Sequence, residues 1–195
     1  MGRRTRHTGH APVETRDRIL DAAAHYGALM HRQPAIAELA RHAGVSRPTV
    51  YRYFADGDAL FRALWEREIG NLLDANPFEG DDLGDLVDRI VDLADRISTH
   101  EVLAPTFTAD ANMVARYVVD RFGTSQRLVF DRLRGAIERV QAAGGVRGGK
   151  PDELTAMVML ILQSAVQSRA MIAEFLDDDA WRRELGHAVT GYLRT

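Results

Sequence analysis

The chain has 195 residues, with 28 acidic residues against 25 Lys and Arg, and no cysteine. That length allows one large or two small domains with a buried core, and the lack of cysteine excludes disulfides and thiolate metal sites. No apolar run approaches the roughly 18 residues of a membrane span, and no apolar segment follows the basic N-terminus, so a cytoplasmic protein without a signal peptide is expected. Residues 1–70 carry a net charge of +3 and residues 71–195 carry −6. The basic excess at the N-terminal end favours nucleic-acid binding there.

The first 14 residues form a basic arm without apolar periodicity. Its cations are Arg3, Arg4 and Arg6, and no acid precedes Glu14. We predict a flexible arm, which is either a solvated tail or a segment that contacts DNA phosphates and the minor groove. Deleting residues 1–12 distinguishes the two, since each lost phosphate contact lowers the salt dependence of DNA binding.

Two histidines in the arm, His7 and His10, have the spacing H-x-x-H. Zinc sites usually recruit cysteines or carboxylates within a folded frame, whereas this pair lies in a segment expected to be flexible. We therefore predict neither a metal site nor another cofactor.

The segment from Ile36 to Leu60 has the organisation of a helix-turn-helix. Its first part carries apolar residues at helical spacing, which predicts one buried stripe. Gly44 follows, where a helix often ends in the left-handed conformation that glycine adopts at low cost. Val45 is expected to fill the space between the two helices, and Ser46 to cap the second one. The residues of the stripe are Ile36, Leu39, Ala40 and Ala43.

The second helix of the motif is expected to start beside Pro48, because proline is tolerated in a first helical turn. Val50 and Phe54 are four positions apart and should share the inward face. A short helix held out in this way fits a DNA major groove. The side chains left to face outward are Arg47, Thr49, Arg52 and, in part, Tyr51 and Tyr53, although core packing is an alternative for the two tyrosines.

These residues resemble the DNA-binding domain of the tetracycline-repressor (TetR) family of transcription regulators. The resemblance covers residues 15–64 and implies a three-helix DNA-binding domain followed by a helical domain for ligand binding and dimerisation. It also implies three partners: double-stranded operator DNA, a small-molecule effector and a second copy of the chain. The family pattern stands here as Leu39-Ala40, Ala43-Gly44-Val45-Ser46, Thr49-Val50-Tyr51, Tyr53 and Phe54, preceded by Ile19-Leu20 and Ala22-Ala23.

The resemblance assigns the DNA contacts to the turn and the second helix. Arg47 is the candidate for base recognition, because a guanidinium bonds O6 and N7 of guanine as a pair, and Pro48 is placed to touch a thymine methyl. The remaining positions are expected to hold phosphates. The full predicted set is Ser46, Arg47, Pro48, Thr49, Tyr51, Arg52 and Tyr53, with Arg3, Arg4 and Arg6 of the arm.

Two positions depart from the family pattern. Where the family often carries a phosphate-binding Thr, this chain has Ala35, and where it commonly carries a Lys, this chain has Gly57 between Asp56 and Asp58. Both changes remove anchors for the DNA backbone. Phosphate contacts are then expected from other residues or from backbone N–H groups at helix starts.

Beyond the motif the chain is predicted to be all-α, with a DNA-binding domain at residues 15–62 and a second domain at 63–195. Pro105 is expected to interrupt one segment, and Pro151 followed by two acids to start a helix. Apolar spacing predicts helices at 59–73, 86–97, 112–122, 126–142, 154–172 and 180–193.

The predicted helix at 154–172 is apolar nearly all round in its first half, so it must be buried on most sides. One explanation is an ordinary intramolecular core. The other, which the resemblance implies, is a four-helix bundle formed by the last two helices of two subunits. The predicted interface consists of Met157, Ile161, Ala165, Trp181, Leu185 and Val189.

The family typically couples release from DNA to a small ligand held in the C-terminal domain. The candidate lining is mostly apolar and aromatic, which favours a ligand of the same character, although each residue also suits plain core packing. The candidates are Trp65, Phe107, Met113, Tyr117, Phe122, Phe130, Met157 and Gln163.

The favoured function is a repressor that binds a palindromic operator as a dimer and is released by a small, mostly apolar molecule. Catalysis is not predicted, because the chain has no Gly-rich phosphate loop, no G-x-S-x-G and no H-E-x-x-H. The alternative is a helical adaptor that uses the helix-turn-helix for protein contacts. Salt-sensitive binding to a selected DNA site, absent for scrambled DNA, separates the two.

Overall fold

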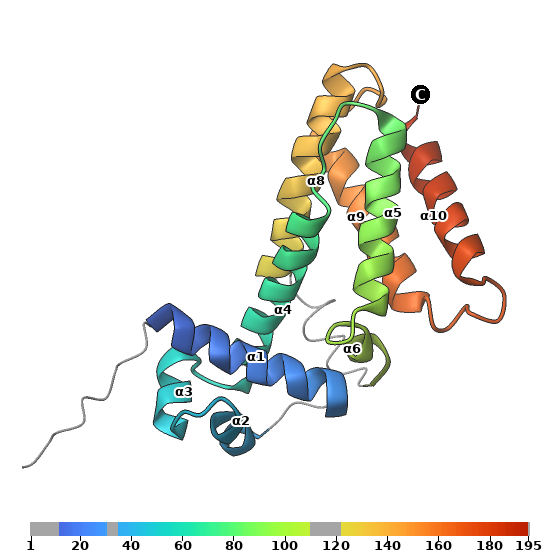
Figure 1. Cartoon of the computed structure of the whole chain (residues 1–195). Helices are drawn as coiled ribbons and strands as arrows, with labels where there is room; N and C mark the ends of the chain where they lie inside the picture. Colours follow the sequence, from blue (N-terminus) through green and yellow to red (C-terminus); the bar gives the residue numbers. More distant parts are fainter. Residues whose placement is uncertain (1–11, 31–34, 110–121, 195) are drawn as a thin grey trace, which may run out of the picture. The chain divides into compact units, whose positions relative to one another are not determined.

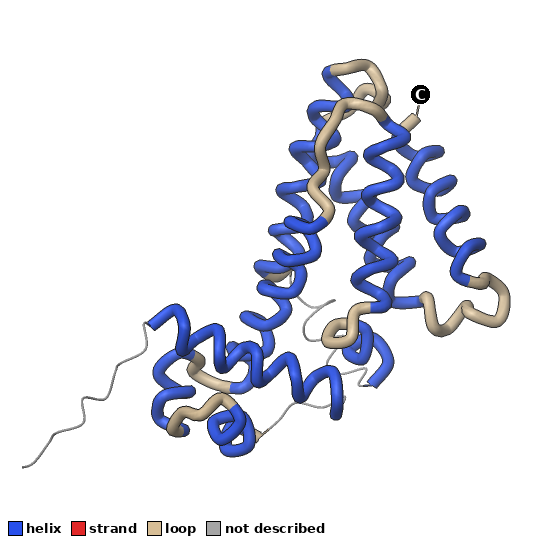
Figure 2. Tube along the Cα trace, in the orientation of Figure 1, coloured by secondary structure: helices blue, strands red, loops and turns tan. Residues whose placement is uncertain are grey.

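The computed structural model describes residues 12–30, 35–109 and 122–194, and these segments form helices and loops without strands (Figures 1 and 2). The predicted all-α class is confirmed. The described residues divide into two compact units, and the chain passes from one to the other within α4, between Leu64 and Trp65. The helices are α1 (Pro12–Met30), α2 (Ile36–His42), α3 (Arg47–Tyr53), α4 (Gly57–Ala75), α5 (Leu83–Thr99), α6 (Ala104–Ala109), α8 (Thr124–Ala142), α9 (Pro151–Ser168) and α10 (Asp178–Leu193).

In the first unit, α1 packs against α2, and α2 packs against α3 (Figure 1). Ile19 and Leu20 of α1, Leu39 of α2 and Val50 of α3 are completely buried and form the core. Helix α1 begins at Pro12, so residues 12–14 of the predicted arm are helical, and residues 1–11 lie outside the described residues. Proline suits the first position of a helix and an acid suits its first turn, which accounts for the earlier start.

In the second unit, α5 packs against α8, α9 and α10 (Figure 1). Asp82 caps α5 by accepting a hydrogen bond from the Asp85 N–H at 3.0 Å, and Asp177 caps α10 by accepting from the Ala180 N–H at 2.8 Å. Each buried Leu or Ile side chain contributes about 1.5–3 kcal/mol by leaving water. The core of the unit includes Leu86, Ile90 and Leu93 of α5, Leu133 and Ile137 of α8, Leu154 and Val158 of α9, and Val189 and Leu193 of α10.

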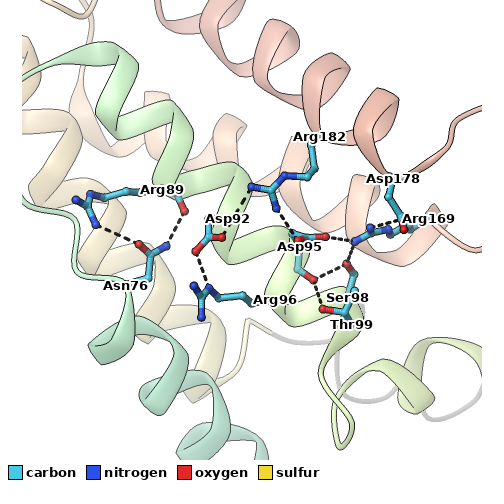
Figure 3. Close-up of polar contacts among 10 residues, drawn as sticks. All are labelled: Asn76, Arg89, Asp92, Asp95, Arg96, Ser98, Thr99, Arg169, Asp178 and Arg182. Carbon is cyan, nitrogen blue, oxygen red and sulfur yellow. Dashed lines mark hydrogen bonds and ion pairs between the residues drawn. The ribbon is translucent and has the colours of Figure 1, made fainter.

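A polar cluster joins α5 to the ends of α9 and α10 (Figure 3). Asp95 of α5 accepts from Arg169 at 2.6 Å and from Arg182 at 2.5 Å. Arg169 also bonds to Asp178 at 2.7 Å and lies over the ring of Trp181, 4.3 Å from its centroid. Burial alone lowers the pKa of Arg169, but the hydrogen bonds with Asp178 and Asp95 outweigh it and raise the pKa above its usual value. Arg169, the C-cap residue of α9, therefore stays charged.

Three predicted boundaries in this unit were wrong. Helix α9 ends at Ser168, four residues before the predicted end at residue 172. Pro105 does not interrupt a helix but lies in the first turn of α6, where its missing N–H is harmless. Helix α8 begins at Thr124, inside the predicted break, because the Gln126 side chain accepts from the Gly123 N–H at 2.7 Å and closes the helix start. The helix predicted at 112–122 lies outside the described residues, except for Phe122.

No helix in the described part of the chain is both long and apolar enough to cross a bilayer. Over the same residues, His, Asp and Glu side chains nowhere gather in threes as metal ligands. His7 and His10 lie outside this part.

Candidate functional site

The turn between α2 and α3 is fixed by backbone hydrogen bonds around Gly44, which has a φ of +64°. The Gly44 N–H bonds to the Arg41 carbonyl at 3.2 Å, and the Val45 N–H bonds to the Ala40 carbonyl at 2.9 Å. This pair of bonds is the Schellman pattern, which uses a left-handed residue to end a helix. The turn sets the direction in which the chain enters α3.

Arg18 of α1 holds this turn from the neighbouring helix. Its Nη2 donates to the Ala43 carbonyl at 2.5 Å and to the Gly44 carbonyl at 3.4 Å. A Cβ on Gly44 would lie 2.8 Å from the same Nη2, so a side chain there would displace the arginine. No sequence pattern indicates this contact, because it joins positions 25 residues apart.

The start of α3 is capped as the sequence predicts. The Ser46 Oγ accepts from the Thr49 N–H at 3.2 Å, and the two hydroxyl groups lie 2.8 Å apart. Val50 and Phe54 are both buried, which confirms their predicted inward orientation. Ser46 thus has a structural role in addition to its predicted DNA contact.

The outer face of α3 is cationic and aromatic. Arg47 and Arg52 are exposed, and the Arg52 guanidinium lies over the Tyr53 ring at 5.2 Å from its centroid. Tyr51 is 53% exposed, so core packing does not describe it, whereas Tyr53 is half-buried beneath Arg52. Of the other predicted residues of α3, Pro48 is exposed and Thr49 is half-buried. Of the other predicted contacts, Arg3, Arg4 and Arg6 lie outside the described residues.

The two departures from the family pattern have different structural consequences. Ala35 stands at the N-cap of α2 and offers no side-chain hydrogen bond. Beside Gly57, the Asp56 Oδ1 accepts from the Ala59 N–H at 2.6 Å and caps α4. A carboxylate there occupies the place that a phosphate takes at an open helix start. At the start of α4, one backbone N–H that a phosphate could contact is therefore already bonded to Asp56.

A cavity lies in the second unit, with a lining drawn from α4, α5, α6, α8 and α9. It holds about 600 Å³ of empty space, including solvent at its mouth. Trp65 and Phe107 form part of its wall, with ring centroids 5.6 Å apart in an edge-to-face arrangement. Three predicted pocket residues line it: Trp65, Phe107 and Gln163.

The other predicted pocket residues lie elsewhere. Phe122 and Phe130 pack edge-to-face against each other, 5.8 Å apart, and neither lines the cavity. Met157 is 44% exposed on the surface of α9. These three are removed from the pocket set, while Met113 and Tyr117 lie outside the described residues. The lining residues that were not predicted include Met159, Leu162, Val166 and Gln167, because a helix that is apolar all round does not indicate which face meets a cavity.

An apolar groove runs between α9 and α10. Leu160, at its edge, is 63% exposed, and Met157 is exposed nearby on the same helix. Val189, predicted at a dimer interface, is completely buried inside the protomer and is removed from that set, because its face of α10 packs into the unit. Trp181 is also largely buried, but it reaches the groove wall. Of the predicted interface residues, the groove is lined by Ile161, Ala165, Trp181 and Leu185.

A helix-turn-helix with a cationic outer helix, followed by a helical unit that holds an apolar cavity, is the architecture of a DNA-binding transcription regulator. Residues 34–64 match the family described as bacterial regulatory proteins, tetR family. Over 93% of its length the chain is 38% identical to an HTH-type transcriptional regulator of Mycobacterium tuberculosis, of which it covers 95%. The chain belongs to the TetR family of transcriptional regulators, as the resemblance predicted.

Solved structures share the fold at lower identity. RolR in complex with resorcinol superposes with a TM-score of 0.68 at 17% identity, over 93% of this chain and 88% of that one. FadR from Bacillus subtilis in complex with stearoyl-CoA superposes with a TM-score of 0.63 at 14% identity, over 94% and 100%. At these low identities the similarity to the solved structures shows a shared fold and nothing more.

Proposed function

We propose that the protein is a repressor that binds a palindromic operator as a homodimer in the cytoplasm and is released when a small, mostly apolar molecule fills the cavity. The proposal of DNA binding rests on the outer face of α3. Arg47 and Arg52 project from a helix whose opposite side is anchored by Val50 in the core. A rigid helix with exposed guanidinium groups suits a major groove, where arginine recognises guanine. No catalytic step is involved.

The dimer part rests on the groove between α9 and α10. A single short recognition helix buries little surface, whereas two copies related by a two-fold axis read two half-sites. The exposed Leu160 and Met157 lie on the helix that the family uses in dimerisation. Covering such side chains against a second copy removes apolar surface from water.

The proposal that a ligand releases the protein from DNA rests on α4, which contributes residues to both units. Leu60 and Leu64 are buried at its N-terminal end, while Trp65 and Ile69 line the cavity. A ligand that fits better when α4 is displaced shifts the population toward a conformer with mis-spaced recognition helices. RolR and FadR have been crystallised with small molecules, which supports an effector of this general kind.

The test is selection of bound double-stranded DNA followed by sequencing, which yields the operator, its symmetry and its half-site spacing together. Arg47→Ala should then cost about 1–3 kcal/mol of binding free energy, concentrated at one guanine per half-site. Arg194→Ala removes an exposed arginine from the second unit and should leave operator binding unchanged. A loss that is uniform over all sequences would make Arg47 a phosphate contact instead of a base reader.

One observation favours the adaptor as a second candidate. Asp56 closes the start of α4, and Ala35 offers no hydroxyl, so two phosphate anchors of the family pattern are absent. An adaptor binds a protein partner and shows no preference between a selected site and scrambled DNA. Steep salt dependence on the selected site alone would exclude it.

A further inference from the structure

The cavity in the second unit has a mostly apolar lining. Among the described residues that line it, none is Asp, Glu, Lys, Arg or His. The walls are aliphatic and aromatic, as at Leu93, Trp65 and Phe107. An ionised group placed there loses its hydration without meeting an opposite charge, which strongly disfavours anions and cations. The described part of the lining therefore favours neutral molecules.

The wall contains few polar side chains, and their hydrogen bonding differs. Gln126 accepts from the Gly123 N–H at 2.7 Å, and Gln163 also has an interaction of its own. The Gln167 Nε2 is buried and has no hydrogen-bond partner among the described residues. A buried donor without an acceptor is costly, and native proteins rarely leave one unsatisfied. Gln167 is one of the residues that line the cavity.

We infer that the effector is a neutral, mainly apolar carbonyl compound, such as a ketone or an ester, and that the Gln167 side-chain amide donates a hydrogen bond to its oxygen. This inference rests on the proposed function in one respect, namely that the cavity is the effector site. The ligand satisfies the orphan donor while its hydrocarbon part covers the apolar wall. Gln167 is then the specificity-determining residue of the cavity.

The experiment uses three probes of one shape: acetophenone, its hydrocarbon analogue α-methylstyrene, and the anion benzoate. Dissociation constants are measured by NMR titration on the full-length protein and on Gln167→Met, which keeps side-chain length and removes the amide. The hydrocarbon controls for changes in packing, so the ratio of the ketone constant to the hydrocarbon constant isolates the hydrogen bond. This ratio should rise about tenfold in the variant.

Two further readouts bear on the inference. The Gln167 amide proton signals, assigned by their loss in Gln167→Met, should move downfield with acetophenone and not with α-methylstyrene. Benzoate should bind wild type at least about tenfold more weakly than acetophenone. An unchanged ratio, a stationary amide signal, benzoate binding as tightly as the ketone, or no binding by either neutral probe would each overturn the inference. Gln167→Glu, which replaces the donor by a carboxylate, serves as the second variant should Gln167→Met unfold, and it should also raise the ratio.

Operator binding is measured separately, so that the two proposals fail in different ways. Acetophenone that binds through Gln167 without changing operator affinity supports the ligand class and overturns the release mechanism. An effector that releases DNA equally well from wild type and Gln167→Met keeps the proposed function and overturns the role of Gln167.

Discussion

The two units differ in the chemical character of the surfaces that carry their candidate functions. In the first unit the candidate function lies on exposed polar atoms, at Arg47 and Arg52, while the apolar residues only hold α3 in place. In the second unit the candidate functions lie on apolar surface, in the cavity and in the groove beside Leu160, and the charged residues form structural links. The net charges of the two parts of the sequence, positive before residue 70 and negative after it, follow the same division.

Because of this difference, we expect substitutions to affect stability and function differently in the two units. Exposed cations in the first unit can be changed at little cost to folding, since surface substitutions usually alter stability by less than about 0.5 kcal/mol. Apolar positions in the second unit should affect folding and, in the dimer proposed above, association as well. A charge placed on the groove of the second unit should therefore be more disruptive than one placed on an exposed apolar residue of the first.

The largest effect is expected from Leu160→Asp. A carboxylate buried in a dimer interface has no partner in the apolar groove, and the dimer dissociation constant should rise at least about 100-fold. Analytical ultracentrifugation over a range of concentrations measures it. The matched control is Val13→Asp, the same kind of change at a residue of α1 that is 71% exposed. A dimer unaffected by Leu160→Asp would remove the groove from the interface.

Asp95→Ala tests whether charged residues in the second unit serve structure. The change leaves Arg169 and Arg182 without their shared acceptor, and we expect a loss of about 2 kcal/mol in the free energy of unfolding. Urea denaturation followed by the fluorescence of Trp65 and Trp181, the second of which lies against Arg169, measures it.

The control for Asp95→Ala is Asp74→Ala. Asp74 pairs with Arg132 at 3.0 Å, but its side chain is 71% exposed, and such surface pairs contribute less than about 1 kcal/mol. Equal losses in the two variants would contradict a special role for the cluster around Asp95.

The local signals of the helix-turn-helix were sufficient to predict its geometry. Gly44 in a left-handed conformation, Ser46 as a cap and Val50 as an inward residue depend on neighbours within a few positions, so the sequence pattern contains them. The predicted start of α8 was wrong even though its cap is also local. Its cap comes from Gln126 reaching back to Gly123, a side-chain choice that apolar periodicity does not report.

The parts of the sites that depend on distant residues were not predictable. Arg18 reaches the turn only because α1 packs beside it, and Gln167 lines the cavity only because of how α9 is rotated against its neighbours. Since α9 is apolar nearly all round, its sequence does not distinguish the exposed Met157 from the cavity-lining Met159. For α10 the difficulty is another one: its single apolar stripe could face either the core or a second subunit, and Val189 of that stripe was assigned to the interface although it is buried in the core.

A smaller effect is expected from Gly44→Ala, which tests the rigidity of the first unit. A residue with a Cβ is strained by about 1–2 kcal/mol in the left-handed region, and here the new Cβ also displaces Arg18 from the Ala43 carbonyl. Gly144→Ala is the control, because Gly144 has a φ of +83° but nothing within 4 Å of the added Cβ. Thermal unfolding should show the larger loss for Gly44→Ala. Equal losses would mean that the Arg18 contact contributes nothing to stability.

The smallest effect is expected from Gly57→Lys, which restores the cation of the family pattern beside the Asp56 cap. One additional phosphate contact should steepen the dependence of log binding constant on log salt concentration by about 0.9 and raise affinity several-fold at low salt. Gly191→Lys adds the same charge to an open position on α10 and should leave the slope unchanged. If both variants gain equally, general charge attraction accounts for the increase. If only Gly57→Lys gains, the first unit binds DNA with one anchor fewer than its family pattern provides, and its remaining affinity depends on the cations of α3.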